Sequence, residues 1–153
     1  PYATVLLVDF GADVIKVESM PYGDPARRIG QAFIDGTSGV FLMWNRSKRG
    51  IAIDQRKPEA REIVRRLIEK ADMLVENFRP GMAEEIGIGW NTVSALNARL
   101  VYLSISAFGP SGPIALYPGT DPVVQAMSGC LRVKKPGKAS VSTFRCWPRS
   151  CSV

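Results

Sequence analysis

Basic and aromatic side chains follow the short apolar runs of this sequence. Arg27 and Arg28 come after the first run, Arg56 after the second, and Phe78 and Arg79 after the third. Guanidinium groups pair with phosphate oxygens, and aromatic faces stack on flat rings. This combination is typical of a site for a ligand that carries both phosphates and a planar ring. Basic loops are also common without any ligand, so composition alone leaves both interpretations open.

Several familiar chemistries are excluded by what the sequence lacks. The chain contains no histidine, so neither a Ser-His-Asp nor a Cys-His mechanism can operate within it. It has no G-x-G-x-x-G fingerprint and no G-x-x-x-x-G-K-[ST] P-loop. Its three cysteines follow no zinc spacing, and we expect no metal site. Carboxylates remain as the candidates for acid–base or nucleophilic work.

The apolar runs that precede these side chains alternate with helical patterns. Short β-branched or apolar runs predict strands at 14–18, 51–53, 72–76 and 100–106. The clearest helix is 58–70, where Pro58 suits the first turn and apolar residues recur at helical spacing. Further helices are expected at 3–10, 82–86, 90–96 and 121–127. The alternation predicts an α/β fold with a parallel sheet covered by helices on both faces and incomplete at both ends.

In such a sheet a ligand binds beyond the carboxyl ends of the strands. The basic and aromatic residues described above would gather at that edge. Arg79-Pro80-Gly81 also precedes a predicted helix, where free backbone N–H groups would face an anion. After Ile105 the chain becomes rich in Gly and Pro, as expected for a surface connection that carries binding groups.

The net charge of +6 arises entirely from the last part of the chain. Residues 1–129 hold equal numbers of acidic and basic side chains, whereas 130–153 hold six basic side chains, no acidic ones and all the cysteines. We therefore expect a domain at 1–129 and a basic tail at 130–153 that is non-native or disordered. The basic tail does not by itself indicate a nucleic-acid partner.

Five segments in chain order closely resemble the family III CoA-transferases, which include formyl-CoA and carnitine-CoA transferases and, as relatives, α-methylacyl-CoA racemases. They are GADVIKVE at 11–18, GDPAR at 23–27, NRSKR at 45–49, ADMLVENFRPG at 71–81, and GTD with QAMSG across 119–129. The resemblance implies an amino-terminal fragment of a Rossmann-like CoA-binding domain, partial at both ends. It also implies a homodimer whose full-length chains interlock like links.

The resemblance also assigns residues to coenzyme A. Carried over position by position, the CoA-binding residues are Ile53, Arg56, Asn77, Phe78 and Arg79. They agree with the strand-end argument, which did not use the family. CoA and its acyl thioester would be substrates, and no tightly bound cofactor is expected.

In the family an aspartate attacks the thioester, and it lies downstream of the QAMSG block. We expect this nucleophile to be absent from the chain, which would leave the chain alone inactive. Asp121 matches a position where some relatives have an assisting acid, although a helix-capping role is an equal alternative.

The resemblance implies a transferase moving CoA between carboxylic acids through a carboxylate-bound acyl intermediate. The alternatives are an α-methylacyl-CoA racemase and a catalytically inactive CoA-binding remnant. Racemases of the family use a histidine before the corresponding aspartate, and Thr120 stands there instead, which favours the transferase. The expected partners are an acyl-CoA and a carboxylic acid, without nucleic acid or membrane. No signal peptide or spanning run is recognisable, and we expect a cytoplasmic protein.

Overall fold

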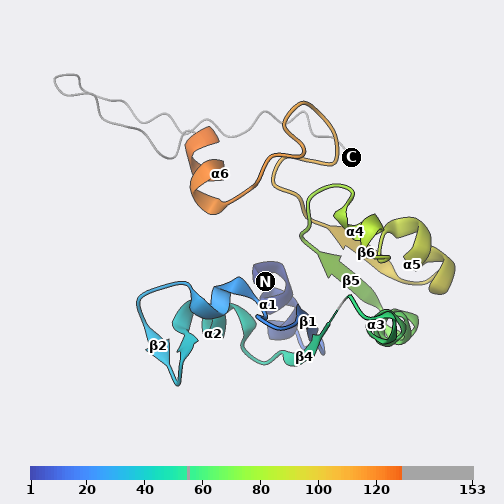
Figure 1. Ribbon diagram of the computed structural model, residues 1–153, viewed down its shortest axis with the longest axis horizontal. Helices are drawn as coiled ribbons and strands as arrows, with labels where there is room; N and C mark the ends of the chain where they lie inside the picture. Colours follow the sequence, from blue (N-terminus) through green and yellow to red (C-terminus); the bar gives the residue numbers. More distant parts are fainter. Residues whose placement is uncertain (55, 129–153) are drawn as a thin grey trace. The chain divides into compact units, whose positions relative to one another are not determined.

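The computed structural model describes residues 1–54 and 56–128, and the proposed tail at 130–153 lies outside them (Figure 1). The chain divides into two compact units. Unit 1 comprises Pro1–Val75 and Trp90–Val101, and unit 2 begins with Glu76–Gly89 and resumes at Tyr102. No helix in the described part of the chain is both long and apolar enough to cross a membrane.

Unit 1 contains a pair of parallel strands, β1 (Ile15–Ser19) and β4 (Arg49–Ile53). Their register places Val17 opposite Ile51 and Ser19 opposite Ile53, so both strands end at the same edge. The predicted strands at 14–18 and 51–53 are thereby confirmed within one or two residues. Such a parallel pair needs a long connection, and the segments between the strands supply it.

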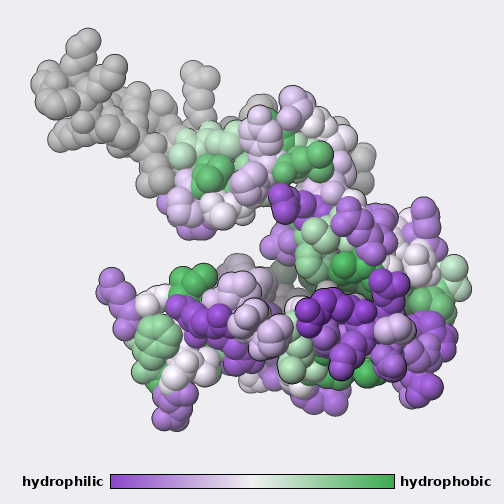
Figure 2. All heavy atoms as spheres, viewed as in Figure 1, coloured by the Kyte–Doolittle hydropathy of each residue, from purple (hydrophilic) through white to green (hydrophobic). Residues whose placement is uncertain are grey.

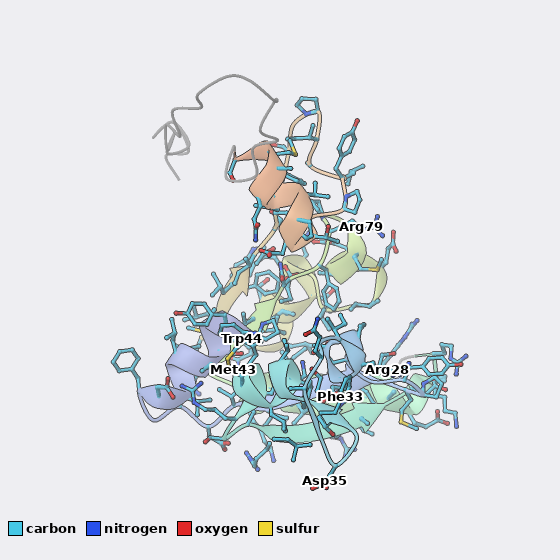
Figure 3. All side chains as sticks on the ribbon, turned by 90° about the vertical axis from the view of Figure 1, so that its left-hand side faces the viewer. Arg28, Phe33, Asp35, Met43, Trp44 and Arg79 are labelled. Atoms are coloured by element: carbon cyan, nitrogen blue, oxygen red, sulfur yellow. The ribbon has the colours of Figure 1, made fainter. Side chains whose placement is uncertain are left out.

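That connection contains a hairpin and a helix that the sequence interpretation missed. The hairpin pairs β2 (Phe33–Ile34) with β3 (Thr37–Ser38) in antiparallel fashion. Asp35 and Gly36 form its tip with φ angles of +48° and +76°, the geometry of a type I′ turn. Figure 3 shows Asp35 at this tip. Ser38 then caps α2 (Gly39–Asn45) by accepting a hydrogen bond from the Val40 amide.

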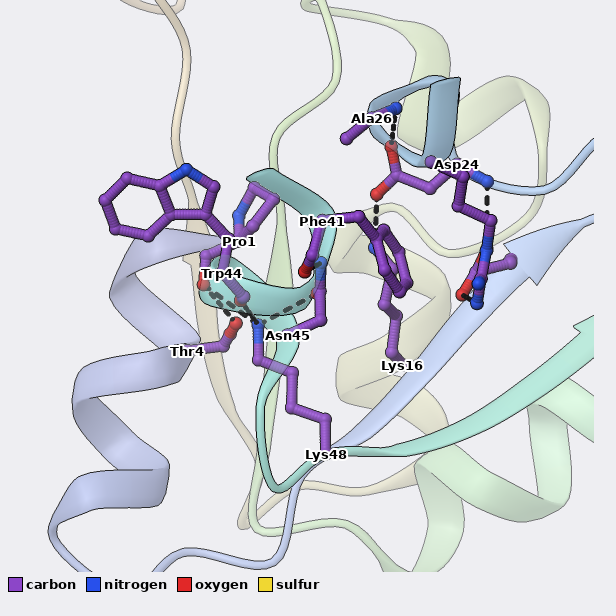
Figure 4. Close-up of polar contacts among 11 residues, drawn as sticks. Pro1, Thr4, Lys16, Asp24, Ala26, Phe41, Trp44, Asn45 and Lys48 are labelled. Carbon is purple, nitrogen blue, oxygen red and sulfur yellow. Dashed lines mark hydrogen bonds and ion pairs between the residues drawn. The ribbon is translucent and has the colours of Figure 1, made fainter. Parts of the chain in front are cut away.

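Helix α1 (Tyr2–Asp9) lies against α2 within unit 1. The rings of Tyr2 and Trp44 meet edge to face with centroids 4.9 Å apart. Lys48 closes the end of α2 by donating to the Trp44 carbonyl at 2.7 Å and to the Asn45 side chain at 3.2 Å (Figure 4). Partial burial lowers the pKa of the Lys48 ammonium, chiefly through desolvation.

The predicted helix at 58–70 is confirmed as α3 (Pro58–Lys70), with Ala60 and Ile68 in the core. It contacts α5 (Trp90–Leu96), whose Val93 is completely buried. A 3₁₀ helix, η1 (Pro25–Arg28), follows β1 and is capped by Asp24. These contacts supply much of the small core of unit 1. Hydrophobic side chains are also exposed on the surface, as Figure 2 shows for one face.

A second strand pair joins β5 (Met73–Glu76) to β6 (Val101–Ser104). The Val101 amide donates to the Asp72 carbonyl and the Ile105 amide to the Glu76 carbonyl, so the partners advance together and the strands are parallel. Helices α4 (Met82–Glu85) and α6 (Asp121–Met127) belong to unit 2. The fold is therefore mixed α/β with short parallel strand pairs, and one continuous sheet covered on both faces stays a prediction.

Candidate functional site

Arg27, expected among the phosphate-binding side chains, has a structural role instead. Its guanidinium donates two hydrogen bonds of 2.8 Å to the carboxylate of Glu18, which is buried. It also lies 3.8 Å from the ring centre of Phe41. The Arg27 hydrogen bonds are the main cause that lowers the pKa of Glu18. Arg27 is thus engaged on both its polar edge and its flat face.

The turn after β1 is held by a second ion pair. Lys16 donates to Asp24 at 2.6 Å, and Asp24 accepts from the Ala26 amide at 2.8 Å (Figure 4). The Asp24 amide in turn donates to Glu18 at 2.9 Å. These bonds explain the GDPAR segment as a folded turn whose charges pair with one another. They do not present free charge to a ligand.

At the end of β4, the two predicted CoA-binding residues differ in accessibility. Ile53 is 6% exposed, and its carbonyl accepts from the Met20 amide at 2.8 Å, so it belongs to the core. Arg56 is exposed and pairs with Asp54 through hydrogen bonds of 2.8 and 2.9 Å. That hydrogen bonding lowers the pKa of Asp54 to about 2. Arg56 can reach a phosphate, but Asp54 competes for its guanidinium.

The other three predicted CoA-binding residues lie together in unit 2. They line a hollow with about 80 Å³ of free space at the carboxyl ends of β5 and β6. The lining residues are Asn77, Phe78, Arg79, Pro80, Ser106, Ala107, Ala115, Tyr117 and Gly119. Its volume is well below the roughly 300–1,000 Å³ of pockets that enclose whole ligands. The hollow therefore suits one group of a larger molecule.

Arg79 is the basic side chain at this hollow. Its guanidinium makes no hydrogen bond or ion pair with any residue in 1–54 or 56–128, and Figure 3 shows the side chain at the surface. Phe78 beside it is 38% exposed, so part of its ring is open to solvent. The expected backbone anion site is less open, because the Met82 amide already donates to the Arg79 carbonyl at 3.1 Å. The side chains of Phe78 and Arg79 are the available groups.

Two residues absent from the sequence-based prediction support this segment. Glu76 is buried, and its carboxylate accepts from the Phe78 amide at 2.7 Å. Tyr102 approaches the same carboxylate with its hydroxyl at 3.5 Å. Desolvation, followed by the charges of Glu76 and Glu84, raises the pKa of Tyr102 to about 12. The signal available in the sequence was an acidic residue that ends an apolar strand, just before Asn77.

The far wall of the hollow is set by a close approach of two loops. A Cβ atom at Gly119 would stand 2.0 Å from the Cβ of Ala107, closer than atoms can approach. Glycine at this position therefore allows the loop after β6 and the segment before α6 to touch. This contact gives a steric reason for the glycine of the GTD segment at 119–121.

Asp121 is the first residue of α6, and Thr120 occupies the N-cap position without a side-chain cap bond. The alternative in which Asp121 caps the helix is therefore wrong. Its carboxylate instead accepts from the Gln125 side chain at 2.6 Å. Asp121 is exposed, so its carboxylate is open to solvent.

Ile53 and Arg56 belong to unit 1, whereas Asn77, Phe78 and Arg79 belong to unit 2. Each group lies at the carboxyl end of a parallel strand, as expected. The gathering of Arg56 with Phe78 and Arg79 into one cradle stays a prediction.

The described residues thus form a mixed α/β fold in which an arginine without a partner among residues 1–54 and 56–128 lies beside an exposed phenylalanine at the end of a strand. The family model for CoA-transferase family III matches residues 1–146, and the chain belongs to that family. The match extends beyond Gly129, where the segments noted in the sequence end.

Two relatives and one solved structure illustrate the similarity. The chain is 43% identical over 129 residues to succinyl-CoA–D-citramalate CoA-transferase of Chloroflexus aurantiacus, covering 84% of this chain and 32% of that protein. It is 44% identical over 135 residues to the BbsE subunit of succinyl-CoA:(R)-benzylsuccinate CoA-transferase of Thauera aromatica, covering 86% and 33%. A CAIB/BAIF family protein from Brucella suis superposes with a TM-score of 0.80 at 38% identity, covering 94% and 40%. The chain spans about a third of the length of these curated relatives.

Proposed function

We propose that the chain is the CoA-binding part of an enzyme that transfers CoA between carboxylic acids. The observation that carries the proposal is the guanidinium of Arg79, which has no partner within the described ranges, beside the exposed ring of Phe78 at the end of a strand in a family III chain. Arg79 would bind a phosphate of CoA and Phe78 would contact its planar ring. Asn77 would line the same subsite, Arg56 would contribute from the end of β4, and Ile53 would support that strand end from the core.

The reaction follows from the nucleophilic chemistry of a carboxylate. An aspartate oxygen bonds to the acyl carbon of the thioester, the C–S bond breaks, and CoA leaves as its thiolate. The thiolate then attacks the aspartyl carbonyl of the mixed anhydride and releases the first acid as a carboxylate. An acceptor carboxylate reverses these steps and leaves as the new acyl-CoA. We propose that Asp121 assists this chemistry and that another aspartate of the whole enzyme is the nucleophile.

Three finer features belong to the same proposal. The strand pairs would form part of a Rossmann-like sheet, the whole enzyme would be an interlocked homodimer, and it would act in the cytoplasm. Exposed apolar side chains such as Phe10, 88% exposed, and Ile34, 62% exposed, are compatible with a partner chain. The relatives named above are CoA-transferases, and Thr120 supplies no acid–base group for a racemase.

Hydroxylamine trapping tests this mechanism. A family-length polypeptide that contains residues 1–128 is incubated with an acyl-CoA and hydroxylamine, and adducts are located by mass spectrometry. We expect a hydroxamate on an aspartate outside 1–128, because hydroxylamine attacks the anhydride and the enzyme-bound thioester. The Asp121→Asn variant should form the adduct more slowly at the same position. Absence of any aspartyl adduct in the wild-type polypeptide would refute the transferase mechanism. An adduct that forms in the wild type but not in Asp121→Asn would make Asp121 the nucleophile.

A further inference from the structure

The carboxylate of Glu76 is buried at the end of β5 without a cationic partner in the described part of the chain. It is 7% exposed, and the ion pairs among residues 1–54 and 56–128 do not include it. Burying a charge without a counter-charge is unfavourable, and buried carboxylates are rare for that reason. Buried polar groups are retained where hydrogen bonds satisfy them. The groups that hydrogen-bond to this carboxylate therefore indicate its role.

That role is visible in the hydrogen bonds of Glu76. Its Oε2 accepts from the Phe78 amide at 2.7 Å, within the range of a charge-assisted hydrogen bond. The bond spans two residues and turns the chain immediately after β5. It therefore fixes the backbone from which the Phe78 ring and the Arg79 side chain leave.

The same turn is attached to the end of β6. The Ile105 amide donates to the Glu76 carbonyl at 3.0 Å, and the Asn77 side-chain amide donates to the Ile105 carbonyl. The Asn77 side chain thus adds one hydrogen bond beyond the last backbone pair of the strands. Residues 76 and 77 are held on both sides, whereas Phe78 and Arg79 are exposed just beyond them.

We propose that Glu76 is a positioning residue, which sets the direction of Phe78 and Arg79 toward CoA by holding the Phe78 amide. The inference rests on the proposed function, since CoA is the ligand that these two side chains would contact. Without the carboxylate, the segment samples other directions in the free protein. Binding must then order it, which weakens affinity by roughly 3- to 10-fold for one or two side chains.

The test compares Glu76→Met with Glu76→Gln. Methionine has a similar length and fills the site but accepts no hydrogen bond of comparable strength, whereas glutamine keeps an acceptor oxygen. In the 153-residue chain we expect Glu76→Met to bind CoA about 3- to 10-fold more weakly in calorimetric titration while the variant remains folded. Glu76→Gln should remain within about twofold of the wild type, because its amide oxygen still holds Phe78. Glu85→Ala, which removes an exposed carboxylate from α4, is the matched control and should bind normally.

Hydrogen exchange of the Phe78 amide gives a second readout that does not depend on CoA. It should accelerate about tenfold or more in Glu76→Met and stay near the wild-type rate in Glu76→Gln. Wild-type affinity in Glu76→Met, or an unchanged Phe78 exchange rate, would overturn the proposal. Failure of Glu76→Met to fold would also overturn it, because the carboxylate would then serve the fold itself. If the wild type bound no CoA, the proposed function would fail, and the exchange rates would still decide whether Glu76 fixes the segment.

Discussion

Three arginines that look equivalent in the sequence differ in how they are held. Arg27 is bound to the buried carboxylate of Glu18, Arg56 is paired with Asp54 at the surface, and Arg79 has no acidic partner in the described ranges. A phosphate must displace an existing partner from the first two but not from the third. Arg79 is therefore the strongest candidate for the first contact with an anion.

The Arg56–Asp54 pair makes a prediction for pH titration. Arg56→Ala removes the main cause of the low Asp54 pKa, so we expect that pKa to rise from about 2 toward the ordinary value near 4. The carboxylate is favoured in the folded state, so the pair stabilises the fold above pH 4 and loses this effect as the pH falls toward 2. Carbon-detected NMR of the Asp54 carboxyl measures the change.

Lys57→Ala provides the control, because Lys57 contributes only the last and smallest of the causes that shift the Asp54 pKa. It should raise the pKa by less than Arg56→Ala does. An Asp54 that still titrates near 2 in Arg56→Ala would show that the ion pair does not form in solution.

Among the secondary-structure elements, the sequence was sufficient to predict the bounds of a helix that has both a start signal and a periodic apolar face. Pro58 and the apolar stripe located α3 with correct bounds, and the ranges of α5 and α6 were also correct. The hairpin was missed because each of its strands has only two residues, too few for a periodic pattern. Helix α2, which follows the hairpin directly, was missed with it. Asp35-Gly36 was the available signal, since this dipeptide favours a type I′ turn.

For the candidate site, the sequence predicted which residues lie at the strand ends but not which partners their charges have. Strand ends and residue types indicated Phe78 and Arg79 as candidates, and the structure places both just after β5, whereas their binding of CoA stays a prediction. The partners of each charge were not predictable, since they depend on turns between segments distant in sequence. Glu18 meets Arg27 only through the turn at Gly23, where φ is +67°, and Glu76 meets Tyr102 across a strand pair.

Asn97 links two elements of unit 1 and allows a stability prediction. Its side-chain amide donates to the carbonyls of Ile68 at 3.0 Å and Ala71 at 2.9 Å, at the end of α3. Asn97→Ala leaves these acceptors without that donor, so we expect a loss of about 1–3 kcal/mol in the free energy of unfolding, measured by urea denaturation. Asn91→Ala, an exposed change on the neighbouring α5, should cost little. Equal stability of the two variants would contradict the assigned role of Asn97.

Across the whole chain, the excess positive charge and the candidate site lie in different parts of the sequence. The excess of +6 resides in 130–153, whereas the candidate CoA-binding residues lie in a part of the chain with no net charge. The proposed binding of CoA would therefore depend on a few placed groups rather than on a general positive field. Both units contribute candidates, Arg56 from unit 1 and Arg79 from unit 2. The family relationship supplies the expected ligand for both.

We propose above that Phe78 and Arg79 form a subsite for coenzyme A. This subsite is tested by calorimetric titration with CoA of the 153-residue chain and of its Arg79→Ala and Arg99→Ala variants. Arg99 has the same charge and an exposed side chain outside the hollow. We expect micromolar binding by the wild type and by Arg99→Ala, and binding about tenfold or more weaker in Arg79→Ala, because a charged hydrogen bond to phosphate is lost. Equal affinity of Arg79→Ala and the wild type, or equal weakening in both variants, would contradict it.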